Sequence, residues 1–452
     1  MSSSLLRTPK SVFDRLGKES VTEAERYSVG YKAYLDAGKT ERECVTEAVR
    51  QAVTHGYTEF QKGSNSKKLY VTQHGKSVML IRRGKKPLAA GLRMVAAHID
   101  SPRIDLKAYP LYEQEGFALL KTHYYGGIKK YHWMATPLEL RGVVYLADGK
   151  KVEITPEPDD PILFISDILP HLGAEQGKKV LSEAFPGEDL NITVGSLPEG
   201  DEKENRIKLT VMTILNQRYG MIEDDFQSAE LSLVPVGNAW DAGLDRSMIG
   251  GYGQDDRSCG YAALLALFDA DEPEYTGVCI LADKEEIGSE GITGMQSAFY
   301  DQVLEDLCET EGVTLRDVYR SSFCLSGDVC NGLDPNFESV SDKKNNAKLG
   351  FGPGVFKYTG TRGKAGASDA SAETMSRLRR LLDNAGVCWQ MGELGKVDQG
   401  GGGTVAKYLA ARNIEVVDIG VPVLNMHAPM EITAKLDCWQ TYKAFLALYN
   451  ER

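Results

Sequence analysis

The chain has 452 residues, of which 42% are hydrophobic and 26% charged, and its formal net charge is −12. This composition is typical of a globular protein, and the length predicts two or three domains. The negative charge argues against nucleic acid or an anionic membrane as a main partner, and no apolar run approaches the roughly 18 residues of a membrane span. Scattered cysteines without a C-x-x-C pair indicate reduced thiols, and the N-terminus has no secretory signal pattern, so we expect a cytoplasmic protein.

The N-terminal part of the chain carries the pattern of two helices followed by a hairpin. Ser20 is a candidate N-cap for the first helix, and Thr40 with Glu43 forms the pattern of a capping box for the second. Apolar residues at helical spacing follow both signals. Two short strands around a turn are then expected within residues 69–81.

An apolar run over residues 91–97 predicts a buried strand that ends in His98 and Asp100. Residues two apart on an extended chain share a face. Asp100 can therefore accept a hydrogen bond from the ring nitrogen of His98 that faces away from a metal. A lone histidine is more often a core or surface residue, but His-x-Asp directly after an apolar strand makes a metal ligand with its orienting carboxylate an equal alternative.

The pattern changes in the middle of the chain. Short alternating segments such as 142–146 and 208–214 are separated by Gly, Pro and charged turns, which indicates a β-rich region. The α/β pattern resumes afterwards. The sequence therefore predicts one domain formed by residues 1–103 and 246–452, interrupted by a β-rich insertion at 104–245.

Further polar side chains follow apolar strands, or begin a helix, in the second half of the chain. Ligands gather at the carboxyl ends of the strands in an open α/β sheet. Imidazoles and carboxylates without thiolates suit a pair of divalent metal ions, and of two adjacent glutamates one can bind metal while the other moves a proton. N-capping is the alternative for Asp255 and Asp256, and a solvated acidic loop is the alternative for Glu285 and Glu286. Asp328 and His427 also follow apolar strands.

These motifs resemble those of the aspartyl aminopeptidase family of dinuclear metallopeptidases, over essentially the whole chain. The resemblance implies an α/β fold, in which a mixed-sheet dinuclear metallopeptidase catalytic domain is interrupted by a β-rich dimerisation domain. The matching motifs, in chain order, are His98-Ile-Asp-Ser-Pro-Arg, Asp255-Asp-Arg, Glu285-Glu-Ile-Gly-Ser-Glu, Ser326-Gly-Asp328 and Pro422-Val-Leu-Asn-Met-His427.

The resemblance also implies a role for each of these residues. Two divalent ions per subunit are expected, zinc ahead of cobalt or manganese, with Glu285 as general base and acid and Asp100 as the residue that orients His98. Asp255 is preferred to Asp256 as the bridging ligand, because the bridging Asp of the wider group is directly followed by Asp or Asn. The implied ligands are His98, Asp255 and Asp328 for one ion, and Asp255, Glu286 and His427 for the other.

The substrate-binding residues correspond less closely to the family pattern. Lys357 aligns with a family lysine that contacts an acidic substrate side chain, although residues 358–362 depart from that pattern. A family histidine that reaches the site of a neighbouring subunit corresponds to His132, or to His123 as the weaker alternative. The resemblance further implies peptide substrates and a homo-oligomer built from dimers, up to a dodecamer.

The expected function is a metal-dependent aminopeptidase that hydrolyses the N-terminal residue of peptides, acidic residues included, through a hydroxide bridging two metals. A metallo-carboxypeptidase or N-acyl amino acid deacylase on the same scaffold is the alternative enzyme, and it would need an Arg or Lys aimed at a substrate carboxylate. The alternative from another class is a non-catalytic assembly protein with a degenerate metal site. Against that alternative, no ligand or base position is replaced.

Overall fold

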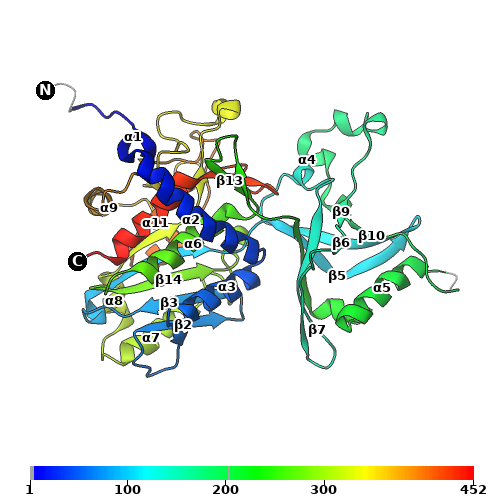
Figure 1. Cartoon of the computed structure of the whole chain (residues 1–452), viewed down its shortest axis with the longest axis horizontal. Coiled ribbons are helices and arrows are strands. Elements are labelled where there is room, and N and C mark those ends of the chain that lie inside the picture. The colour runs from blue at the N-terminus through cyan, green and yellow to red at the C-terminus, as the bar shows by residue number, and fades with distance from the viewer. Residues whose placement is uncertain (1–4, 202–203) are drawn as a thin grey trace. The chain divides into compact units, whose positions relative to one another are not determined.

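The computed structural model describes residues 5–201 and 204–452, which form a mixed α/β fold of two compact units (Figure 1). The first unit comprises Met1–Asp100, Asn238–Met426 and Glu431–Arg452, and the second comprises Ser101–Gly237 and His427–Met430. The α/β fold class predicted from the sequence is confirmed. The division into a catalytic domain and an insertion at 104–245 stays a prediction.

A nine-stranded mixed sheet forms the centre of the first unit. In spatial order its strands are β1 (Thr58–Glu59), β2 (Lys68–Gln73), β3 (Ser77–Arg82), β14 (Thr276–Ala282), β4 (Leu92–His98), β15 (Phe323–Gly327), β19 (Glu415–Gly420), β17 (Gly354–Phe356) and β18 (Gln390–Met391). The four strands β14, β4, β15 and β19 run parallel, and β3 and β17 flank them in antiparallel orientation. The antiparallel pair β2–β3 is the hairpin that the sequence predicts.

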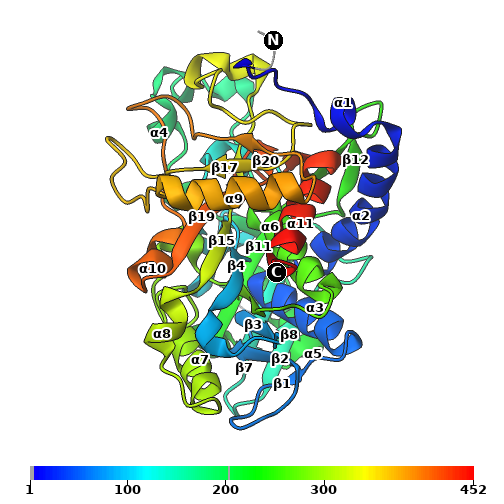
Figure 2. The same cartoon turned by 90° about the vertical axis from the view of Figure 1, so that its left-hand side faces the viewer.

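Helices cover both faces of this sheet (Figure 2). Successive side chains of a strand point to opposite faces, so β4 contributes Val95 and Ala97 to one hydrophobic core and Met94 and Ala96 to the other. Because both faces are covered, every residue of β4 is buried. The first core packs against α2 (Lys18–Ala37), α3 (Glu41–Thr54), α6 (Gln254–Asp269), α9 (Ala372–Asn384) and α11 (Lys435–Tyr449), and the second against α7 (Phe299–Glu309), α8 (Leu315–Arg320) and α10 (Ala406–Ala411).

Both predicted N-terminal helices are present, but the first begins earlier than its pattern indicates. α2 starts at Lys18, and Ser20 lies inside its first turn, where the hydroxyl donates to the carbonyl of Gly17 (2.6 Å) instead of capping the helix. The capping box of α3 forms as predicted. The Glu43 N–H donates to the Thr40 hydroxyl (3.3 Å), and the Glu43 carboxylate accepts from the Thr40 N–H (2.9 Å).

Two further sheets complete the structure, one in each unit. The first unit holds a five-stranded sheet of β12 (Trp240–Ala242), β13 (Met248–Gly251), β21 (Glu431–Ala434), β20 (Pro422–Leu424) and β16 (Cys330–Asn331). The second unit holds an antiparallel sheet of β8 (Lys151–Ile154), β7 (Leu138–Tyr145), β11 (Ala229–Pro235), β5 (Arg103–Gln114), β6 (Phe117–Tyr125), β10 (Ile192–Gly195) and β9 (Phe164–Ile165).

The second unit also contains a helix where the sequence pattern predicts a strand. Residues 208–214 belong to α5 (Arg206–Tyr219), which buries Ile207 and Val211 one helical turn apart. The carboxylate of Glu113 on β5 accepts hydrogen bonds from the N–H groups of Ile207 (2.8 Å) and Lys208 (3.0 Å). Glu113 thus caps the first N–H groups of α5 from a strand that is distant in sequence. This tertiary contact stabilises a helix although the β-branched residues of the segment favour a strand.

All eight cysteine side chains are buried thiols and none forms a disulfide. Burial raises the pKa of Cys44 and Cys279 to about 12, so these thiols stay protonated at neutral pH. Within the described ranges, none of the helices combines the length and the apolar character needed to cross a membrane.

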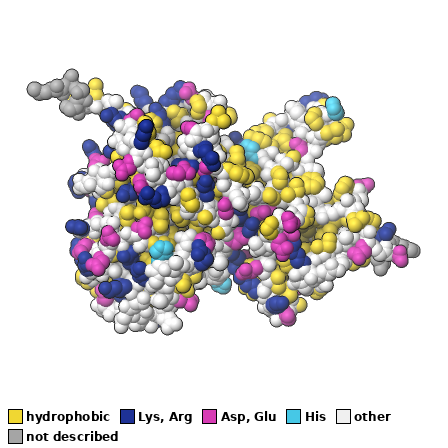
Figure 3. Space-filling model, in the orientation of Figure 1, with side chains coloured by type: hydrophobic (Ala, Val, Ile, Leu, Met, Phe, Trp, Pro, Cys, Tyr) yellow, Lys and Arg dark blue, Asp and Glu magenta, His cyan; other side chains and the backbone are white. Residues whose placement is uncertain are grey.

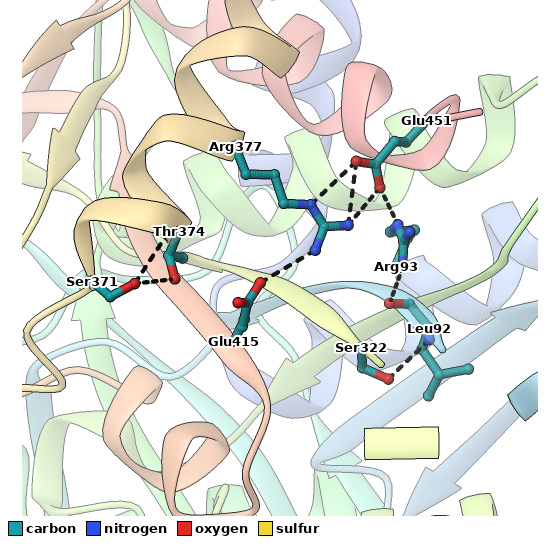
Figure 4. Close-up of polar contacts among 8 residues, drawn as sticks. All are labelled: Leu92, Arg93, Ser322, Ser371, Thr374, Arg377, Glu415 and Glu451. Atoms are coloured by element: carbon teal, nitrogen blue, oxygen red, sulfur yellow. Dashed lines mark hydrogen bonds and ion pairs between the residues drawn. The ribbon is translucent and has the colours of Figure 1, made fainter. Parts of the chain in front are cut away.

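The carboxylate of Glu451 forms ion pairs that connect the C-terminal end of the chain to the central sheet (Figure 4). It pairs with Arg93 on β4 and with Arg377 on α9, and Arg377 also pairs with Glu415 on β19 (3.3 Å). Arg93 is only 4% exposed, so its charge depends on this partner. Burial by itself raises the pKa of Glu451, but the hydrogen bonds and charges of Arg377 and Arg93 outweigh burial and leave the pKa below its usual value.

We therefore expect Glu451→Gln to lower the free energy of unfolding by about 1.5–3 kcal/mol, the usual loss for a hydrogen bond to a charged group. The pKa of Glu451 is lower in the folded than in the unfolded state. The loss of unfolding free energy in Glu451→Gln is therefore fully present above the unfolded-state pKa of about 4.3, and it disappears as the pH falls through the folded-state pKa. Urea denaturation at several pH values measures it. Glu305→Gln, at an exposed position, is the control, and a loss that stays constant down to pH 3 would contradict the account.

Candidate metal centre

The carboxyl ends of three neighbouring parallel strands meet at one edge of the central sheet. In the register of β4 with β14, Ala282 lies opposite His98, and in that of β4 with β15, Ser326 lies opposite Ala96. His98 is the last residue of β4, and Glu285 and Asp328 follow the ends of β14 and β15. The register therefore brings polar residues from distant parts of the sequence to one place.

Six side chains form a cluster at this edge, in groups of three whose possible ligand atoms lie within 4.8 Å of one another. Nε2 of His98 lies 3.2 Å from Oδ1 of Asp255 and 4.0 Å from Oδ1 of Asp328. The groups are His98 with Asp255 and Glu286, His98 with Glu285 and Asp328, and Asp255 with Asp256 and Asp328. Four of the five ligands predicted from the sequence, and the predicted base, therefore lie together.

The carboxylates of this cluster repel one another because they are close together and are partly or fully buried. Burial is the main cause that raises the pKa of Asp256, to about 8, with the Asp255 carboxylate adding to it and the charge of His98 opposing it. Burial also raises the pKa of Asp328. The charge of His98 opposes this rise, and the carboxylate of Glu285 adds to it. A bound cation would favour the ionised forms of these groups. Imidazole nitrogen and carboxylate oxygen without thiolate are a donor set that fits zinc.

Asp256 belongs to the cluster although the sequence analysis favours its neighbour. It is fully buried, and neither of its carboxylate oxygens has a hydrogen-bond partner among the residues that the structure describes. The peptide bond between Asp255 and Asp256 is cis, and both residues lie at the start of α6 with non-helical backbone angles. The preference for Asp255 as the bridging ligand stays a prediction.

Asp100 contacts both the histidine and the two glutamates. Its backbone carbonyl lies 3.0 Å from Nδ1 of His98, and its Oδ1 lies 3.4 Å from the same nitrogen. Its two carboxylate oxygens accept hydrogen bonds from the N–H groups of Glu285 (3.1 Å) and Glu286 (3.2 Å). One buried side chain thus fixes the turn that carries both glutamates and also faces the ring of His98. Of these contacts, the sequence predicts only the one between Asp100 and the ring of His98.

A second buried carboxylate, Glu431 on β21, holds the start of α6 and was not found in the sequence analysis. Its Oε2 accepts a hydrogen bond from the N–H of Asp255 (3.0 Å), and its backbone carbonyl accepts from Nε2 of Gln254 (2.6 Å). The Thr433 hydroxyl donates to the side-chain oxygen of Gln254 (2.6 Å). These contacts join segments about 180 residues apart, so no local motif could have revealed them.

The remaining predicted histidines lie in the second unit. His427 is half-buried, and its Nδ1 lies 2.6 Å from the carbonyl oxygen of Gly127, so a proton on Nδ1 leaves Nε2 as the nitrogen suited to a metal. His132 ends a short 3-10 helix, and burial and the charge of Lys129 lower its pKa. His123 is exposed on β6, with Nδ1 2.7 Å from the carbonyl oxygen of Tyr124.

Lys357, the predicted substrate contact, lies in the first unit directly after β17. Its side chain is exposed, and its backbone carbonyl accepts a hydrogen bond from the N–H of Ala370 (2.7 Å). This contact positions the backbone of the segment. The lysine side chain is therefore accessible to a ligand from solvent.

Comparisons with known proteins agree with this geometry. The family model of the aminopeptidase I zinc metalloproteases (M18) matches residues 34–449. A probable M18 family aminopeptidase 1 of Clostridium acetobutylicum is 45% identical over 465 residues, covering 100% of both chains. The crystal structure of an M18 aminopeptidase from Thermotoga maritima has a TM-score of 0.95 at 42% identity, covering 99% of this chain and 100% of that one. A structure described as the S. cerevisiae mApe1 dodecamer shares the fold at 21% identity, with a TM-score of 0.77 over 94% of this chain and 96% of that one.

The contacts of Asp100 predict that Asp100→Ala weakens zinc binding by about 10–100-fold, the usual effect of removing a residue that orients metal ligands. The reason is that the Glu285 and Glu286 N–H groups lose their acceptor and His98 loses a carboxylate beside Nδ1. Competition with a chelator measures the affinity. Asp271→Ala, which removes an exposed carboxylate of the same unit, is the matched control. Equal zinc affinity in the two variants would refute this role for Asp100.

Proposed function

Because the chain belongs to the M18 family of aminopeptidase I zinc metalloproteases and is a metal-dependent aminopeptidase, we propose that its cluster at the ends of β4, β14 and β15 binds two zinc ions. The groups of possible ligand atoms overlap at His98, Asp255 and Asp328, which supports more than one ion, and Asp255 is the proposed bridging ligand. The proposed ligands are His98, Asp255, Glu286, Asp328 and His427.

Zinc, when bound, supplies a Lewis acid that polarises the scissile carbonyl and lowers the pKa of water. Glu285 is the proposed general base and acid, which accepts a proton from water at a carboxylate oxygen and delivers it to the departing amine nitrogen. Its side chain is half-buried, so water and substrate can reach it. Its backbone N–H is held by Asp100, which limits the positions that the carboxylate can take.

The charge of the cluster supports a substrate with a free α-amine. Carboxylates attract an α-ammonium group and repel the C-terminal carboxylate of a peptide. This charge therefore favours removal of the N-terminal residue over carboxypeptidase chemistry. The relatives described above are named as aminopeptidases, in agreement with that choice.

Glu285→Gln is expected to keep zinc near the wild-type content and to lower the rate of hydrolysis by about 10²–10⁴-fold, the range for loss of general acid–base catalysis. The amide retains the size of the side chain but cannot accept the proton. Metal analysis and assays with aminoacyl chromogenic substrates measure the two effects. Glu290→Gln in the same loop, at an exposed position, is the control. More than about a tenth of the wild-type rate in Glu285→Gln would refute the proposed role.

Lys357 is proposed to contact the side chain of an acidic N-terminal residue, because its ammonium group is exposed after β17. An opposite charge at this position would favour Asp and Glu over Leu at the substrate N-terminus. Lys357→Ala is expected to reduce the ratio of kcat/KM for aspartyl and leucyl substrates. An unchanged ratio would exclude this contact.

Assembly into a cytoplasmic homo-oligomer, with a dimer as building block and a dodecamer as the full particle, completes the proposal. The second unit exposes many apolar side chains (Figure 3), a surface typical of an interface between subunits. His132 is proposed to reach the active site of a neighbouring subunit in this assembly. Among the apolar side chains of the second unit, those of Tyr109, Leu172, Val180, Leu181 and Leu197 are more than half exposed.

Light scattering at micromolar concentration tests this assembly. We expect a monodisperse particle whose mass is twelve times the 49.6 kDa of one chain, because the apolar surface of the second unit would be covered only between subunits. A species of 49.6 kDa would refute oligomerisation. A stable dimer would support the building block and exclude the dodecamer under these conditions.

A further inference from the structure

The first unit contains a cavity whose chemistry is opposite to that of the metal centre. It has a volume of about 700 Å³ and lies between the N-terminal segment, the loop 343–351 and the residues around β18. Six cationic side chains and a single carboxylate line it, in a chain whose net charge is −12. The cations are Arg7, Lys10, Arg15, Lys343, Lys344 and Lys348.

Buried hydrogen bonds fix the walls of this cavity. The N–H of Val12, the first residue of α1 (Val12–Leu16), donates to the carbonyl of Gly350 (2.8 Å), and Val12 is completely buried. The N–H groups of Gly350 and Gly352 both donate to the buried carboxylate of Asp437 (2.7 Å each). Gln390 holds the backbone of Lys348 from both sides, accepting from its N–H (2.9 Å) and donating to its carbonyl (2.7 Å). The N-terminal segment is therefore attached to a rigid base.

The positive charge of the cavity is largely uncompensated. Lys343 pairs with Glu338, and among the described residues the structure shows no ion pair for the other five cations, although the Asp342 carboxylate accepts a hydrogen bond from the backbone N–H of Lys344 (2.9 Å). The one acidic side chain, Asp14, is occupied by hydrogen bonds from the backbone N–H (3.3 Å) and the hydroxyl (2.7 Å) of Ser11. Several like charges around one cavity attract a ligand with more than one negative charge.

Two further features indicate what else the ligand contains. Phe351 and Trp389 line the cavity and are half-buried, and Nζ of Lys348 lies 5.9 Å from the centroid of the Phe351 ring. Aromatic rings of this kind stack on flat groups. Asn346 lines it too and is 4% exposed, and its Oδ1 has no hydrogen-bond partner among the described residues. Its Nδ2 already donates to the carbonyl of Asn331 (3.3 Å). A buried amide oxygen in this state can accept a hydrogen bond from a ligand or from water.

We propose that this cavity binds a nucleoside polyphosphate. The phosphates would pair with the cations, the base would stack on the aromatic rings, and an amino or hydroxyl group would donate to Oδ1 of Asn346. Inorganic polyphosphate would supply the charge alone. An acidic peptide would supply carboxylates and N–H donors but no flat heterocycle. The volume is within the range of small-molecule sites, about 300–1,000 Å³.

The test uses the full-length zinc-loaded protein, with ATP in the presence of excess Mg²⁺ so that the nucleotide does not extract zinc. Isothermal titration calorimetry measures affinity, and quenching of tryptophan fluorescence reports stacking on Trp389. We expect saturable binding, quenching that is lost in Trp389→Phe, and at least about tenfold weaker binding of tripolyphosphate and of adenosine than of ATP. Zinc content is measured before and after titration.

Charge-reversal variants locate the site. Arg15→Glu and Lys344→Glu are each expected to weaken ATP binding by at least about tenfold, the loss that corresponds to one charge-assisted hydrogen bond. Lys150→Glu makes the same change of charge at an exposed position of the second unit and is expected to leave binding unchanged. Thermal melting verifies that all three variants are folded. Asn346→Leu, which removes the acceptor, is expected to weaken binding of ATP but not of tripolyphosphate.

Four binding results would overturn the proposal, and a fifth would assign the nucleotide to a different site. The four are absence of ATP binding, equal ATP binding by the wild type and both charge-reversal variants, tripolyphosphate that binds as tightly as ATP, and a glutamate-rich peptide that binds more tightly than ATP. The third would indicate a simple anion site, and the fourth a peptide-binding surface. ATP binding accompanied by zinc loss and insensitive to Arg15→Glu would place the nucleotide at the metal centre instead.

Discussion

The repulsion among the carboxylates at the ends of β4, β14 and β15 is the constraint on which the structure of the site depends. Burial raises the pKa of Asp256 and of Asp328, and the neighbouring carboxylates add to this rise while the charge of His98 opposes it. The fold holds them together through contacts outside the cluster. The Asp100 carboxylate accepts hydrogen bonds from the backbone N–H groups of Glu285 and Glu286. The Glu431 carboxylate accepts a hydrogen bond from the backbone N–H of Asp255. The protein thus maintains an arrangement that becomes favourable when a cation neutralises it.

The sheet makes this arrangement possible because its central strands are parallel and buried on both faces. Strand β4 contributes alternate residues to two cores, so its carboxyl end is rigid where His98 emerges. Glu285 and Glu286 are adjacent in sequence but lie in different groups of possible ligand atoms. A ligand and a proton acceptor can therefore come from consecutive residues, since the turn that carries them is fixed at its backbone by Asp100.

Local patterns in the sequence predict what local geometry determines, and long-range contacts account for the differences. The strand that ends in His98 and the capping box of Thr40 follow from spacing alone. The helix α5 does not, because Glu113, 94 residues away in sequence, caps it. Glu431 lies 176 residues from Asp255, so its role leaves no local signal. The roles of the ligands stay predictions, as does the division at 104–245.

The central claim is that the cluster of His98 and its neighbouring carboxylates binds two zinc ions. Anomalous scattering at the zinc absorption edge from crystals of the zinc-loaded protein tests it most directly, because the signal locates each ion independently of the protein model. The account predicts two peaks per chain, with Asp255 in contact with both. A single peak, peaks bridged by Asp256 without Asp255, or no peak among these residues would contradict it.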